Sequence, residues 1–109
     1  MKKSETETNK ELIEYLLKAG FAVWRNNSGV MRSGKRFIRF GKIGSGDIIG
    51  MTPSGRFISI ENKSNGEPVS QDQKEFAEMV KSKNGIALFV MSLDDLIKQL
   101  DKNYHDLPF

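Results

Sequence analysis

The segment from residue 46 to residue 63 constrains the fold of this chain more than any other. It contains two short runs rich in isoleucine, separated by Thr52-Pro53-Ser54-Gly55. Proline suits the second position of a turn because its φ is held at about −65°, and glycine suits a position that needs a left-handed residue. The segment therefore predicts a β-hairpin.

Three charged residues are expected to meet at the open end of this hairpin. Strand side chains alternate between two faces, so Glu61 and Lys63 share one face, and the antiparallel return brings them beside Asp47. Neighbouring carboxylates repel, and a hard divalent cation with oxygen ligands is the usual means of keeping both ionised. A lysine beside them can orient a water or offset negative charge at phosphorus. The alternative is a solvated hairpin end whose charges only maintain solubility.

Asp47, followed fourteen residues later by Glu61-Asn62-Lys63, resembles the PD-(D/E)xK nuclease motif. Gly46 stands where the motif name has proline, a common variation that leaves the acid in place. From about Glu5 to Asp101 the chain is similar to the stand-alone VRR-NUC domains of phages and bacteria. The segments that carry this similarity are Trp24-Arg25-Asn26-Asn27-Ser28-Gly29, Phe40-Gly41, Gly44-Ser45-Gly46-Asp47-Ile48-Ile49 and Val69-Ser70-Gln71-Asp72-Gln73-Lys74-Glu75-Phe76.

The resemblance implies a metal site and a set of catalytic roles. Asp47 and Glu61 would bind Mg²⁺ or Mn²⁺, with the backbone carbonyl of Asn62 as a further ligand. Lys63 would orient the attacking water or offset charge in the transition state. Gln73 has two compatible interpretations, because it closes a helix cap and also matches the fourth-motif glutamine of VRR-NUC-like proteins.

The first helix offers a less clear ligand. In the wider superfamily this helix often contributes a glutamate to the metal site. Alignment of Gly20-Phe21-Ala22-Val23 with the similar segment of archaeal Holliday-junction resolvases puts Asn9 at that position. Glu5, one turn earlier on the same helical face, is the candidate substitute. Alternatively, the acids of this helix simply form its solvated face.

Composition limits the remaining possibilities. The 109 residues are enough for one domain with one modest core. The resemblance implies that residues 1–109 are a single VRR-NUC-like nuclease domain, with flexible ends at about 1–8 and 103–109. Cysteine is absent, and His105 is the only histidine, so any metal must be bound by oxygen. No apolar run has the length of a signal peptide or a membrane span, which favours the cytoplasm of a bacterium or a phage-infected host.

A basic segment precedes the acidic residues. Residues 25–46 contain no acid, although the net charge of the whole chain is only +3. Such a segment suits a phosphate backbone, because each neutralised phosphate releases a counterion; the alternative is a solubilising loop. The residue pattern at 35–40 predicts a short hairpin strand, and Arg36 and Lys42 are candidates for flanking the binding groove. The predicted DNA-binding residues are Arg25, Asn26, Asn27, Ser28, Arg32, Lys35, Arg36, Arg39 and Lys42.

The remaining patterns predict three helices and two further strands. Helical spacing from about Asn9 to Gly20 predicts the first helix, and the apolar run 21–24 predicts a strand in which Trp24 packs into the core rather than stacking on a base. Ser70 predicts the N-cap of a helix over 71–82. The run 86–91 suits an interior strand covered on both sides, and Ser92 caps a last helix with Asp94 and Asp95 in its first turn.

This order of elements predicts an α/β fold, with a central mixed β-sheet flanked by helices on both faces, as in the restriction-endonuclease-like core. The expected function is a metal-dependent DNA endonuclease, structure-selective and of nicking or junction type. Because one chain offers one active site, a homodimer is expected. Two alternatives stay open: a non-catalytic DNA-binding module for junctions or ends, and a small structural subunit for which the basic segment has no evident use.

Overall fold

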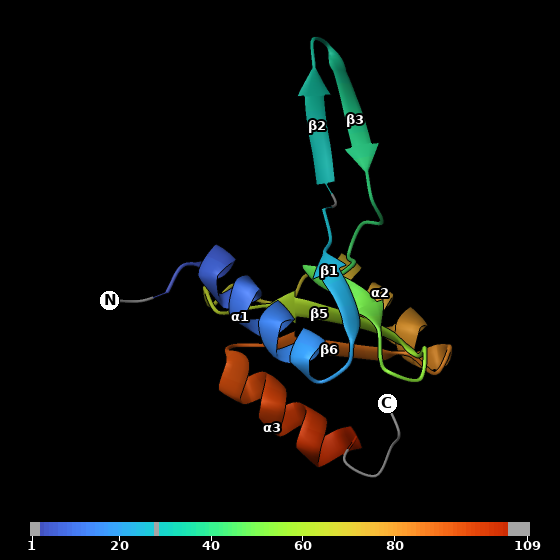
Figure 1. The fold of residues 1–109 in the computed structure, drawn as a ribbon. Coiled ribbons are helices and arrows are strands. Elements are labelled where there is room, and N and C mark those ends of the chain that lie inside the picture. Colours follow the sequence, from blue (N-terminus) through green and yellow to red (C-terminus); the bar gives the residue numbers. More distant parts are fainter. Residues whose placement is uncertain (1–2, 28, 105–109) are drawn as a thin grey trace.

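The computed structural model describes residues 3–27 and 29–104, without the side chains of residues 29–31, 38–40 and 104. It contains three helices and six strands (Figure 1). In chain order they are α1 (Glu5–Lys18), β1 (Ala22–Arg25), β2 (Gly29–Ser33), β3 (Arg36–Phe40), β4 (Ile48–Met51), β5 (Phe57–Asn62), α2 (Gln71–Ser82), β6 (Ile86–Val90) and α3 (Leu93–Tyr104). His105 lies outside the described residues.

Four strands form a central sheet in the order β1-β4-β5-β6. The first three strands pair antiparallel with one another, and β6 pairs parallel with β5. The predicted α/β class and the mixed sheet are therefore confirmed. The parallel pair needs a crossover connection, which α2 provides.

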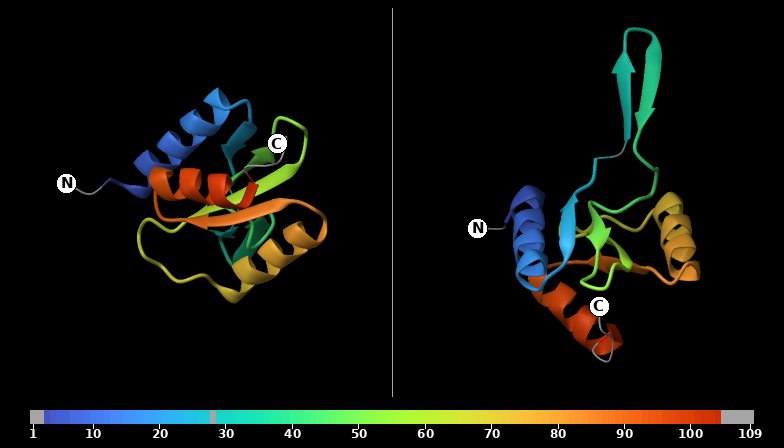
Figure 2. Two further views of the ribbon diagram at one scale, coloured as in Figure 1. Left: turned by 90° about the horizontal axis from the view of Figure 1, so that it is seen from below. Right: turned by 45° about the vertical axis from the view of Figure 1, so that its right-hand side comes forward.

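Helices cover both faces of this sheet (Figure 2). On one face α1 and α3 enclose the larger core, which contains Leu12, Leu16, Ile48, Ile58, Ile60, Ile86, Leu96 and Leu100 among others. On the other face α2 forms a smaller cluster in which Phe76, Ala77 and Val80 pack with Ala87 and Phe89. Alternation of strand side chains accounts for the division, because Ile58 and Ile60 point to the first face while Ser59 and Glu61 point to the second.

The predicted β-hairpin is confirmed. Strand β4 pairs with β5 in a register that places Ile48 opposite Ile60 and Met51 opposite Phe57. The turn closes where the amide of Gly55 donates to the carbonyl oxygen of Thr52 (2.9 Å), and Gly55 has a φ of 89°. This left-handed conformation is strained for residues with a β-carbon, which explains the glycine.

Helix α1 begins earlier than predicted. It starts at Glu5 instead of about Asn9, because Ser4 and Glu7 form a capping box that satisfies free amides of the first turn. The hydroxyl of Ser4 accepts from the amide of Glu7 at 3.1 Å. Residues 5–8, predicted as part of a flexible end, are therefore helical.

One predicted burial, that of Trp24, and one predicted strand position, that of β6, are wrong. Trp24 is 51% exposed instead of packed in the core, because it points to the α2 face and lies on β1, beyond the part of the sheet that α2 covers. Strand β6 is covered on both faces as predicted, yet it is the last strand in the sheet order instead of an interior one. An apolar run indicates that both faces of a strand are covered, but it does not indicate how many strands lie beside that strand in the sheet.

The basic segment forms a separate two-stranded antiparallel sheet, β2–β3. These strands project from the rest of the fold as an arm (Figure 1). The arm includes the strand predicted over residues 35–40. Because β2 and β3 pair chiefly with each other, the arm contributes little to the core.

The last two helices agree with the sequence pattern. The α2 helix spans residues 71–82 with a Ser70–Gln73 capping box, and α3 follows Ser92, whose hydroxyl accepts from the amide of Asp95 (3.1 Å). Among the described residues, no helix has the length and apolar character needed to cross a membrane.

Candidate functional site

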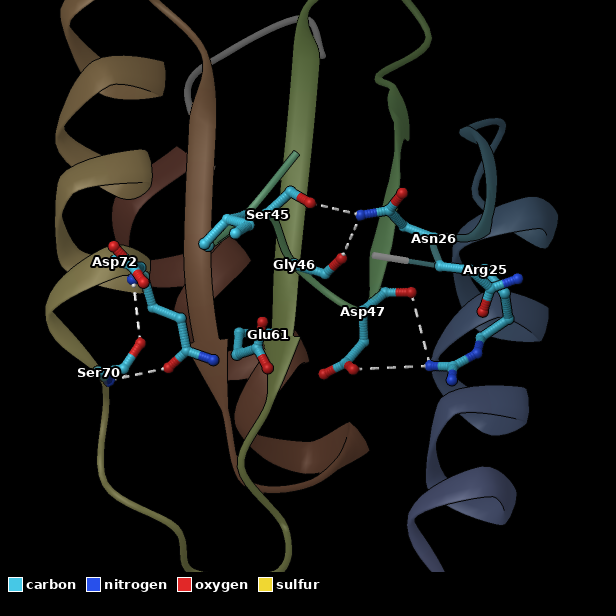
Figure 3. Close-up of a pocket in the computed structure, with 12 residues that line it drawn as sticks. Arg25, Asn26, Ser45, Gly46, Asp47, Glu61, Ser70 and Asp72 are labelled. Carbon is cyan, nitrogen blue, oxygen red and sulfur yellow. Dashed lines mark hydrogen bonds and ion pairs between the residues drawn. The ribbon is translucent and has the colours of Figure 1, made fainter. Parts of the chain in front are cut away.

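Asp47 and Glu61 form an acidic pair at the open end of the β4–β5 hairpin. Ile48 lies opposite Ile60 in the antiparallel pair. Asp47 precedes Ile48 and Glu61 follows Ile60, so these two acids are cross-strand neighbours on the other face of the sheet. Both line a pocket of about 590 Å³, and their carboxylates point toward one another in it (Figure 3). The structure thus brings together two acids that are distant along the chain.

The environment of this pair favours protonation of one carboxylate. Burial raises the pKa of Glu61, and the negative charge of Asp47 and a hydrogen bond with it raise this pKa further, to about 8. The positive charge of Lys63 acts in the opposite direction and lowers the pKa of Glu61. The raised pKa favours a protonated Glu61 at neutral pH when no cation is bound, and a divalent cation would have to displace that proton.

Arg25 and Asn26 close one side of the pocket. The Arg25 guanidinium lies 3.8 Å from the carboxylate of Asp47 as an ion pair. Asn26 donates from its side-chain amide to the hydroxyl of Ser45 (2.7 Å) and to the carbonyl oxygen of Gly46 (2.9 Å). These bonds tie the end of β1 to the loop that leads into β4, and they hold the backbone around Asp47 in place.

The N-terminus of α2 closes the opposite side. Gly44 has a φ of 85°, and a β-carbon there would collide with the carbonyl oxygen of Asp72, so only glycine permits the loop to approach the helix this closely. Gln73 lines the pocket, and its side-chain oxygen accepts from the amide of Ser70 at 3.0 Å. The capping role and the pocket-lining position of Gln73 therefore coexist.

Lys63 lies near the acidic pair but outside the residues that line the pocket. It is buried, and its ammonium donates to the carbonyl oxygen of Pro68 at 3.1 Å. Its effect on the pKa of Glu61 shows that its charge reaches the pair. No pattern in the sequence indicates the Pro68 contact, because this contact depends on the path of the loop after β5.

Glu5, the predicted first-helix ligand, lies near enough for its charge to raise the pKa of Glu61, but its carboxylate bonds to a loop residue. The carboxylate of Glu5 accepts from the side-chain amide of Asn65 at 3.2 Å. Asn9 is buried in α1, and its side-chain oxygen accepts from the side-chain amide of Asn62 at 3.1 Å. Within residues 3–27 and 29–104 no three Asp, Glu or His side chains lie close enough to hold a metal together, so Glu5 does not complete such a group with the pair.

The donor set at the acidic pair nevertheless suits Mg²⁺ or Mn²⁺. Two close carboxylates supply the hard oxygen ligands that these ions prefer. The N–H of Asn62 donates to the Asp47 carboxylate at 2.7 Å, and the N–H and C=O of one strand residue point to the same side. The carbonyl of Asn62 is thus directed to the Asp47 side of β5, as its predicted role requires.

The predicted DNA-binding residues fall into two groups. Arg25, Asn26 and Asn27 line the pocket. Residues of the second group are exposed along the arm or at its base, and they comprise Arg32, Lys35, Arg36 and Lys42. Ser28 and the side chain of Arg39 lie outside the described part of the chain. No protein-family model, curated protein or solved structure shows detectable similarity to this chain.

Proposed function

We propose that this chain is a divalent-metal-dependent DNA endonuclease with a restriction-endonuclease-like core, selective for DNA structure and of nicking or junction type. The observation that carries the proposal is the acidic pair. Asp47 and Glu61 face each other in a pocket at a sheet end, where burial and mutual repulsion raise the pKa of Glu61 to about 8. Such a perturbed carboxyl pair in a cleft is typical of a functional site.

Each residue around the pair has a role in this proposal. Asp47, Glu61 and the carbonyl oxygen of Asn62 would hold the cation. Bound Mg²⁺ or Mn²⁺ supplies Lewis-acid polarisation of the scissile phosphate and acidifies a water molecule. Lys63 offsets negative charge that develops at phosphorus, and Gln73 at the N-terminus of α2 helps to hold the phosphate.

The surrounding cations support DNA as the substrate. Arg25 lies beside the acidic pair, and the exposed cations of the arm extend the positive surface away from the pocket. A phosphate backbone that enters the pocket would thus be neutralised on the way. Because one chain offers one acidic pair, cutting two strands requires two copies, and a homodimer forms part of the proposal.

Cleavage of a DNA panel tests the proposal. Purified protein is incubated with supercoiled, linear, single-stranded and four-way-junction DNA in EDTA or in Mn²⁺. We expect cleavage only with the cation, and a loss of at least about a thousandfold in Asp47→Asn and Glu61→Gln. Asp94→Asn is the matched control, because Asp94 is an exposed acid on α3, across the sheet from the pair. Cleavage by Glu61→Gln at the parent rate would refute the proposal.

A non-catalytic DNA-binding module is the second candidate. It is favoured by the lack of a third acidic or histidine side chain beside the pair within the described residues. Such a module would bind junctions or ends equally well in EDTA and in Mn²⁺, with strong salt dependence and no cleavage. The same panel, read by gel mobility and by product formation, separates the two candidates.

A further inference from the structure

Trp24 is a large aromatic residue left in solvent beside the acidic pair. It is 51% exposed on β1. Its cross-strand partner is Ile49, which in turn lies opposite Ser59, so Trp24 points to the same face of the sheet as Glu61. On that face α2 packs against β5 and β6, and the β1 end of the sheet is left open.

The indole lies close to the pocket. Asp47 precedes Ile49 by two residues on the same face, and such diagonal cross-strand neighbours are about 7–8 Å apart. Asn26 follows Trp24 by two residues, directly after the end of β1, and lines the pocket itself. A phosphate held at the acidic pair would therefore have an aromatic surface within reach of the adjoining nucleotide.

The surroundings indicate a nucleobase as the occupant. The exposed side chains of Met51 and Phe57 form the next row on the same face, so the indole has further exposed apolar side chains beside it. Arg25, next in the chain, supplies a cation at the pocket edge. An apolar platform bordered by positive charge is the arrangement used to bind single-stranded nucleic acid, where bases stack on aromatic rings and phosphates contact cations.

We propose that Trp24 stacks against an unpaired base next to the phosphate held at the acidic pair. This inference rests on the proposed function for the identity of the bound polymer. A base can reach a ring on a sheet face only after leaving its own stack, so Trp24 favours single-stranded or flapped DNA over intact duplex. Trp24 thereby contributes to the choice of substrate, without a part in the chemical step.

Tryptophan fluorescence tests the stacking directly, because Trp24 is the only tryptophan in the chain. Glu61→Gln protein in EDTA is titrated with a thymidine 12-mer, with an abasic 12-mer that keeps the same phosphates, and with a blunt duplex. We expect quenching by the thymidine oligomer and little by the other two. In the same background, Trp24→Leu should bind the thymidine oligomer about tenfold more weakly by anisotropy, and the abasic oligomer with unchanged affinity.

Leu17→Ala is the matched control, because Leu17 is an apolar residue as exposed as Trp24 and lies on α1, across the sheet from the indole. It should leave all affinities unchanged. Equal quenching by the abasic oligomer, or an unchanged affinity of Trp24→Leu for the thymidine oligomer, would overturn the inference. A blue shift of the tryptophan emission that grows with protein concentration in the absence of DNA, together with dimer formation in sedimentation, would also overturn the inference. A second copy of the chain would then cover the indole.

Failure of this inference is distinguishable from failure of the proposed function. Parent protein that cleaves DNA in Mn²⁺ while Trp24→Leu keeps full affinity refutes the stacking alone. Quenching by the thymidine oligomer without cleavage by the parent refutes the nuclease and retains the stacking. Absence of any DNA binding refutes both.

Discussion

The two faces of the central sheet are built from the same strands and differ in almost every other respect. One face is sealed by α1 and α3, and its side chains from Ile48, Ile58 and Ile60 are fully buried. The other is covered by α2 only at the β5–β6 end, and it carries the acidic pair and the exposed Trp24. One hairpin supplies both surfaces through alternate residues.

This comparison shows how a small domain separates stability from chemistry. Burial of charges and exposure of aromatic rings both reduce stability, and the sealed face offsets this through its apolar core. Substitutions should therefore affect folding on one face and binding or cleavage on the other.

Adjacent isoleucines on β4 give the sharpest test. Ile48 is fully buried on the sealed face, whereas Ile49 is only partly buried on the open face. We expect Ile48→Ala to lower the free energy of unfolding by about 3 kcal/mol and Ile49→Ala by about 1 kcal/mol. Urea denaturation measures both values. Equal losses would show that the open face is packed as tightly as the sealed one.

The acidic pair should make stability depend on pH. The pKa of Glu61 is about 8 in the folded protein, whereas its ordinary value is 4.5, so between these limits the folded protein binds more protons than the unfolded chain. In EDTA the free energy of unfolding should therefore fall as pH rises from about 5 to about 8. Glu61→Gln should remove this slope, and Mn²⁺ at pH 8 should restore stability to the parent protein.

A flat pH profile in EDTA for the parent protein would contradict the raised pKa of Glu61. A profile that persists in Glu61→Gln would assign the titration to another group. Melting experiments at constant ionic strength distinguish these outcomes, because screening of surface charges is then held fixed.

The two capping boxes provide a matched pair of helix variants. Ser4 caps α1 on the sealed face, and Ser70 caps α2 beside the pocket. Each change to alanine should cost about 1 kcal/mol, because an amide of the first turn loses its partner. Only Ser70→Ala should also slow DNA cleavage, since Ser70 and Gln73 both line the pocket. Equal cleavage by the two variants would show that the α2 terminus is not involved.

Removal of the arm should have the smallest effect on stability. Replacement of residues 29–40 by two glycines deletes β2 and β3, which pair mainly with each other. We expect the free energy of unfolding to change by less than about 1 kcal/mol. DNA affinity should fall. A plot of the logarithm of the DNA association constant against the logarithm of salt concentration should become less steep, by about 0.9 for each lost phosphate contact. An unchanged slope would exclude the arm from the DNA interface.

The local structure of this chain could be predicted from its sequence because it depends on residues close together. The Thr52–Gly55 turn, the Ser70–Gln73 cap and the alternation that separates Glu61 from Ile60 all involve partners a few positions apart. The capping box at Ser4 has the same local signature, so the start of α1 at Glu5 is also predictable from the sequence pattern. Pairing of Asp47 with Glu61 followed from a short antiparallel hairpin, in which the register is set by the turn.

Sequence alone thus determined the three helices, the hairpin and the two carboxylates that meet at its open end. Tertiary structure alone decided that Trp24 lies in solvent, that β6 ends the sheet and that Asn9 bonds to the side chain of Asn62. The physical reason is that burial at a given position depends on which distant element packs over it. Which element packs over a position depends on how all the layers of the fold pack together, and the residue pattern of a single helix or strand does not predict this.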